Sequence, residues 1–91
     1  MIVHVIEDRE LVTAIVQEGN FDDVVHVDNE KMYVKYGVDR VWIARPSGNK
    51  TYVLYTSCVE LARKSIVSII RKIMDRESAG INIGKISVPL F

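Results

Sequence analysis

Aromatic and cationic side chains alternate in two consecutive stretches of the chain. Tyr33 and Lys35 are two residues apart, and so are Arg40 and Trp42. Residues i and i+2 of a β-strand point to the same face of its sheet, so each pair shares a face. If both pairs face the same way, rings stand beside cations, as they do where proteins stack the bases of a single strand and hold its phosphates. The pattern predicts a nucleic-acid-binding surface.

Cations outside these two stretches extend the predicted surface. Lysine and arginine side chains strengthen nucleic-acid binding by neutralising phosphates, whatever the base sequence. No RNP, KH or helix-turn-helix pattern accompanies them. The alternative is that Trp42 and the four tyrosines fill the core or a dimer interface, the commoner use of aromatic residues in strands, while the cations face solvent. The additional phosphate-binding candidates are Arg45, Lys50, Lys64, Arg71 and Lys72.

Candidates for catalysis or metal binding are few. Cys58, the single cysteine, follows a predicted strand at a helix N-terminus, where N–H groups stabilise a thiolate. The spacing to Arg63 is one residue short of the C-x5-R motif of phosphatases, so we favour a core role for the thiol. His26 and Asp28 are too few for a metal site, and His4 stands among Ile and Val as a core histidine would. We assign no catalytic residue, metal or cofactor.

A predicted helix over residues 57–80 is the best-defined element of the scaffold. Ser57 and Glu60 form an S-x-x-E capping box, and Gly80 stands where a left-handed residue would end the helix. The helix is amphipathic, so it needs a sheet to pack on. Its apolar stripe consists of Cys58, Val59, Ala62, Ile66, Ile69, Ile70 and Ile73.

The other elements follow from period-two patterns and turn residues. Asp8 caps a short helix over residues 9–18. A four-residue loop at 28–31 and a Pro-Ser-Gly-Asn turn within 46–50 close two hairpins, and Gly84 marks a bulge or bend in an extended tail. The predicted strands span residues 1–6, 24–27, 32–36, 40–45, 51–56 and 81–91.

The order of these elements, β-α-β-β-β-β-α-β, predicts an α+β fold in a single compact domain over residues 1–91. We expect a mainly antiparallel meander sheet, packed on one face by the long C-terminal helix and the shorter N-terminal helix. The last strand can pair within the chain or across a dimer. The apolar ending Leu90-Phe91 is compatible with the dimer.

Charge is distributed unevenly although the formal net charge is zero. Residues 1–30 hold eight acids and one base, whereas residues 31–91 hold eleven bases and four acids. The two parts either pair within the fold or form one acidic and one basic face. The 14 Val and 11 Ile residues are compatible with a thermophilic source. Without a long apolar run or a signal-peptide pattern, we expect a cytoplasmic protein that does not enter a membrane.

Asp39 stands two residues after Gly37, and a turn, a second strand, a helix and a final strand follow. This arrangement resembles the core of restriction-endonuclease-like nucleases. In that family an acid after a glycine and an acid-x-lysine on the next strand hold a divalent metal. Here Leu54 and Thr56 stand where the glutamate and lysine are expected, although Glu10 matches a helix acid of the family. The resemblance implies a degenerate, inactive relative.

We therefore expect a small, non-enzymatic, homodimeric binding protein that acts by association. Nucleic acid is the favoured partner, through the basic and aromatic sheet face, and a regulatory role is compatible with it. The first alternative is a protein-interaction module or inhibitor that uses the acidic N-terminal third. The second is the degenerate nuclease relative.

Overall fold

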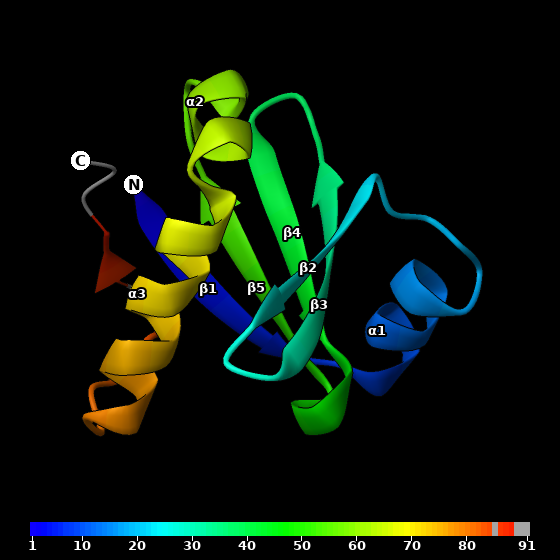
Figure 1. Ribbon diagram of the computed structural model, residues 1–91, viewed down its shortest axis with the longest axis horizontal. Coiled ribbons are helices and arrows are strands. Elements are labelled where there is room, and N and C mark those ends of the chain that lie inside the picture. Colours follow the sequence, from blue (N-terminus) through cyan, green and yellow to red (C-terminus); the bar gives the residue numbers. More distant parts are fainter. Residues whose placement is uncertain (85, 89–91) are drawn as a thin grey trace.

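The fold is built on an antiparallel sheet (Figure 1). The computed structural model describes residues 1–84 and 86–88, and within them the sheet has six strands in the order β2-β3-β4-β5-β1-β6. β2 to β5 form a meander, and β1 lies between β5 and β6. The predicted α+β class and antiparallel sheet are confirmed. The strands are β1 (Ile2–Glu7), β2 (Asp23–Val27), β3 (Glu30–Tyr36), β4 (Arg40–Arg45), β5 (Lys50–Tyr55) and β6 (Ile86–Ser87).

The two predicted hairpin turns follow the local turn chemistry. Arg45 pairs with Lys50 around a 3-10 turn at Pro46–Gly48, as predicted. The other loop is shorter than the predicted four residues, because Val27 pairs directly with Glu30. Its two residues, Asp28 and Asn29, have φ angles of 50° and 65°. Short Asx side chains tolerate this left-handed backbone, so two residues are enough to reverse the chain.

One face of the sheet forms the main core together with the C-terminal helices. Alternate residues of β4 and β5, such as Val41, Ile43 and Leu54, are fully buried beneath α2 (Val59–Lys64) and α3 (Ile66–Ser78). The helical residues buried there are five of the predicted apolar stripe: Ala62, Ile66, Ile69, Ile70 and Ile73.

The predicted helix over residues 57–80 starts later and is broken. The predicted capping box is wrong: the N-cap is Cys58, whose N–H donates at 3.1 Å to Thr56 Oγ1, just after β5. At Ser65 the backbone leaves the helical region, with φ −112° and ψ 14°. The break lets α2 contact β4 while α3 contacts β2. No helix in the described residues has the length and apolar character needed to cross a membrane.

The end of α3 is stopped by glycine, as predicted. Gly80 has φ +77°, and its N–H donates to the Glu77 carbonyl at 3.0 Å. The next N–H, from Ile81, donates to the Arg76 carbonyl at 3.0 Å. These two bonds form a Schellman motif, which requires a left-handed residue at this position.

The second face of the sheet carries the N-terminal helix. α1 (Arg9–Val16) contacts β3, β4 and β5, and Asp8 Oδ1 caps it by accepting from Leu11 N at 3.1 Å. Its buried residues Val12 and Ile15 are not part of the main core. The buried strand residues that are also outside that core are Ala44, Thr51 and Val53. The helices thus divide between the two faces instead of sharing one, and Figure 1 shows α1 and α3 on opposite sides of the strands.

The tail after α3 returns to the sheet within the same chain. Among its described residues Ile86–Ser87 form a strand, paired with β1, whereas residues 81–84 do not, so the strand predicted from residue 81 begins later. Val88 N donates to the Met1 carbonyl at 2.8 Å, and Gly84 lies in a turn where its N–H donates to Asn82 Oδ1 at 2.9 Å. The predictions at residues 89–91, including the apolar ending, lie outside the described residues. Homodimerisation therefore stays a prediction.

Replacement of Gly80 by alanine tests the Schellman motif. A Cβ at Gly80 would meet nothing within 4 Å, so the cost is conformational alone. We expect Gly80→Ala to lower the free energy of unfolding by about 1 kcal/mol, measured by urea denaturation. Gly48→Ala is the control, because its Cβ would make only ordinary contacts with Lys50, the nearest at 3.6 Å. Equal stability of Gly80→Ala and the parent chain would contradict the assignment.

Candidate nucleic-acid interface

The second face of the sheet is open where α1 does not reach it. The strand register places Lys35 opposite Trp42, and Arg40 opposite Tyr55. Since cross-strand partners share a face, the cation and aromatic residues predicted from period-two spacing do lie on one side. Tyr55 is 40% exposed and Ile2, its partner on β1, is 50% exposed, whereas Trp42 and Lys35 are half-buried.

Tyr55 is held between two other side chains of this face. Arg40 Cζ lies 5.1 Å from the centroid of the Tyr55 ring, and the His4 ring meets it edge-on at 5.2 Å. The guanidinium of Arg40 is oriented by Asp39, with Nε 3.1 Å from Oδ1, and this hydrogen bond lowers the pKa of Asp39. His4 is therefore not the core histidine predicted from its neighbours. Tyr55 was also missed, although counting back from the 45–50 turn pairs it with Arg40.

Carboxylates are absent from the strand positions of this face in the described residues. Glu7, Asp23 and Glu30 belong to the alternate set, which faces the main core. Asp39, in the loop beside Arg40, is the nearest acid in sequence. We name the area around Ile2, His4, Lys35, Arg40, Trp42 and Tyr55 the open face.

Tyr33 lies on the same side but at the covered end. Its ring meets Phe21 edge-on at 4.9 Å, and Lys31 Nζ stands 5.4 Å from its centroid. Phe21 belongs to the connector between α1 and β2, which brings it against the sheet. Tyr33 pairs with buried Ala44 and is itself half-buried. It therefore lies at the border of the open face.

The other five predicted cations lie elsewhere. Arg45 and Lys50 point to the core face, in register with Ile43 and Tyr52. Lys64, Arg71 and Lys72 are on α2 and α3, the helices that cover that core face. The structure thus brings four of the nine predicted residues together, Tyr33, Lys35, Arg40 and Trp42, and separates the rest from them.

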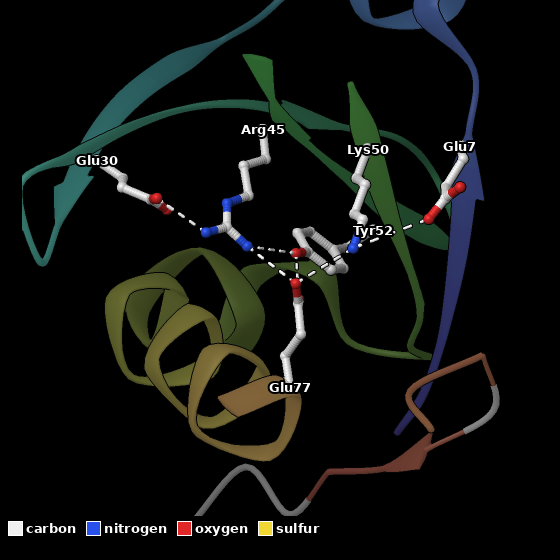
Figure 2. A network of polar contacts seen from close by, with 6 residues as sticks. All are labelled: Glu7, Glu30, Arg45, Lys50, Tyr52 and Glu77. Atoms are coloured by element: carbon white, nitrogen blue, oxygen red, sulfur yellow. Dashed lines mark hydrogen bonds and ion pairs between the residues drawn. The ribbon is translucent and has the colours of Figure 1, made fainter. Parts of the chain in front are cut away.

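Arg45 belongs to a polar network at the end of the main core (Figure 2). Its Nη2 donates to Glu30 Oε1 at 2.8 Å, and its Nη1 donates to Glu77 Oε1 at 3.0 Å. The Tyr52 hydroxyl donates to Glu77 Oε2 at 2.5 Å and accepts from Arg45 Nη1 at 3.2 Å. The network attaches the last turn of α3 to the β4–β5 hairpin.

Lys50 completes the network on its β1 side. Its Nζ lies 3.4 Å from Glu77 Oε1 and 3.8 Å from Glu7 Oε1. A pocket of about 350 Å³ opens next to these groups, lined also by Val5 and residues 81–84. The carboxylates and cations are already engaged with one another, so we assign the network to stability. Two of its ion pairs, Glu30–Arg45 and Glu7–Lys50, join the acidic N-terminal third to the basic remainder of the chain.

The surroundings of the network shift several pKa values. Burial raises the pKa of Tyr52 to about 12, helped by its hydrogen bond to Glu77. Burial alone would raise the pKa of Glu77, but the Tyr52 hydrogen bond and the nearby Lys50 and Arg45 lower it overall. The hydrogen bond to Glu30 raises the pKa of Arg45.

Glu77 was missed by sequence reasoning, although a signal was present. It lies four residues after Ile73 and seven after Ile70, on the same stripe of α3 that enters the core. An acid on a buried helix stripe requires a partner, because an unpaired buried charge is costly. Arg45, two residues after buried Ile43, supplies the matching charge on the inward side of β4.

The catalytic alternatives find no assembled centre in the described residues. Asp39 precedes β4 and pairs with Arg40, whereas Glu10 is on α1, which packs near the opposite end of that strand. Within residues 1–84 and 86–88, no group of three or more His, Cys, Asp or Glu side chains could hold a metal ion. Cys58 is a half-buried N-cap of a six-residue helix, without a side-chain capping bond.

Comparisons of the chain with family models, with curated proteins and with solved structures found no match.

The polar network predicts a stability change at high pH. The folded state holds the Tyr52 proton up to about pH 12, whereas an unfolded tyrosine releases it near pH 10. Between these values the unfolded state binds fewer protons, so the free energy of unfolding falls as the pH rises. Between pH 9 and 12 we expect the free energy of unfolding of the parent chain to fall by roughly 2 kcal/mol more than that of Tyr52→Phe.

Urea denaturation of both proteins at intervals from pH 8 to pH 12 measures this difference. At pH 8 the side chain at position 52 is neutral in both proteins. The difference between their free energies of unfolding at that pH therefore measures the hydrogen bonds of the hydroxyl, and it serves as the control. A difference between the two proteins that stays constant up to pH 12 would contradict the shifted pKa.

Proposed function

We propose that this chain is a small binding protein that holds nucleic acid on the open face of its sheet. The observation that carries the proposal is the composition of that face: Trp42 and Tyr55 rings beside Lys35 and Arg40, with no carboxylate at the strand positions that the structure describes. A polyanion with planar bases matches both features, since phosphates attract the cations and bases stack on the rings.

The net charge of zero does not oppose this proposal, because local charge decides the contact. Exposed charges farther apart than about 8–10 Å are largely screened at physiological salt. Several acids that balance the charge lie on the core side or at strand ends. Glu30 and Glu7 pair with cations of the core-side network, and Asp22 Oδ2 accepts from Tyr36 N at 2.7 Å.

The acidic N-terminal third is a weaker candidate for the binding surface. Asp8 caps α1, Asp22 binds the β3 backbone, and Glu30 pairs with Arg45. Carboxylates engaged in this way hold elements of the fold and have less capacity to recognise a partner. We therefore place the open face ahead of the acidic segment.

A salt titration with Lys35→Ala tests the proposed function. We expect the full chain to bind a fluorescently labelled oligonucleotide with an affinity that falls as salt rises, measured by anisotropy. Loss of one phosphate contact should weaken binding and reduce the slope of log K against log salt by about 1.

Lys64→Ala is the matched control, because Lys64 is an exposed lysine on α2, away from the open face. We expect this variant to keep the affinity and the salt slope of the parent chain. Absence of binding at low salt, or binding that salt does not weaken, would overturn the proposed function. Equal losses in both lysine variants would remove the open face as its location.

A further inference from the structure

On the basis of the function proposed above, we infer that the ligand is a single strand, and that the open face holds two splayed bases on Trp42 and Tyr55. The inference rests on how the rings and cations repeat across the strands of the sheet.

The open face contains the same pair of groups twice. Trp42 on β4 lies directly opposite Lys35 on β3. Tyr55 on β5 lies directly opposite Arg40 on β4, whose guanidinium stands 5.1 Å from the ring centroid. Each unit therefore offers a ring for a base with a cation beside it. In the second unit Asp39 already accepts from Nε and Nη2 of Arg40, so a phosphate that binds there must compete with this exposed ion pair. Arg40 can also stack on a base, as guanidinium planes do.

The spacing of the two units favours bases that are separated from each other. Trp42 pairs with Val53, so Tyr55 is its diagonal neighbour on the adjacent strand. Diagonal neighbours in an antiparallel pair are about 7–8 Å apart. Bases stacked in a nucleic-acid strand repeat every ~3.4 Å. Two adjacent bases can occupy both rings only if they are unstacked from each other, which a single strand allows.

A duplex does not offer its bases to a surface of this kind. Its bases are stacked on one another, and its major groove is read by an inserted helix or two-stranded ribbon. The open face is made of strand side chains, and the neighbouring helix α1 packs its buried residues on the sheet. A duplex can therefore reach only the cations.

Preorganisation supports Tyr55 as one of the two stacking residues. Its ring is held by Arg40 on one side and meets His4 edge-on, at centroid distances of 5.1 and 5.2 Å. Little side-chain freedom remains to be lost on binding, which favours affinity. Tyr55 as a residue is nevertheless 40% exposed, so a base can reach it.

The fluorescence of Trp42 supplies a direct test, because Trp42 is the single tryptophan of the chain. A base stacked on the indole changes its emission, whereas a contact confined to phosphates leaves the ring free. We expect single-stranded oligonucleotides to quench Trp42, and a duplex of equal length to bind at least ~10-fold more weakly without quenching.

Substitutions at Tyr55 test the second unit. Tyr55→Leu keeps an apolar side chain but removes the ring, and should weaken single-strand binding by about 5- to 100-fold. Tyr55→Phe keeps the ring and should recover the affinity that Tyr55→Leu loses. Circular dichroism and urea denaturation confirm that each variant is folded.

The outcomes separate this inference from the proposed function. If neither single strand nor duplex binds, the proposed function fails. If both bind equally, with salt dependence but no quenching of Trp42, the proposed function stands and the single-strand inference is overturned. Unchanged affinity in folded Tyr55→Leu also overturns it. If a polyglutamate peptide binds more tightly than the oligonucleotides, the partner is an acidic protein and both proposals fail.

Discussion

The alternation of side chains along each strand is the constraint on which the structure depends. Every residue of β4 and β5 serves one of two faces, and the faces have different tasks. Inward residues such as Ile43 and Leu54 pack beneath α2 and α3. Outward residues are divided again, because α1 covers Ala44 and its neighbours while Trp42 and Tyr55 remain at the uncovered end. A register slip of one residue would exchange the two sets, so packing of the main core also determines which side chains form the open face.

Much of the fold was predictable because local chemistry determined it. The turn after Arg45 and the glycine stop of α3 follow from backbone preferences that need no tertiary information. The break at Ser65 was not predictable, because it depends on tertiary packing: α2 contacts β4, whereas α3 contacts β2. The side of the sheet occupied by α1 was also missed, because a helix stripe shows that a partner surface exists but not which face provides it.

The candidate site was predictable to the extent that period two applies. The spacing of two residues correctly placed Arg40 and Trp42 on the same face. By the same rule Arg45, an odd number of residues after Trp42, lies on the other face. Grouping Arg45 and Lys50 with the surface by charge alone ignored this parity. Their partner Glu77 comes from a distant helix, so the network depends on tertiary packing that charge counting does not provide.

The position of β1 between β5 and β6 has a consequence for the order of folding. β2 to β5 are joined by short turns, so their pairing closes small loops and has a low entropic cost. β1 pairs with β5 about 50 residues away in sequence, and such long-range contacts form slowly. We expect the meander to form first and the N-terminal strand to join it later. His4 then reaches Tyr55 only at this late step, so the open face is complete only after the N-terminal strand has paired with β5.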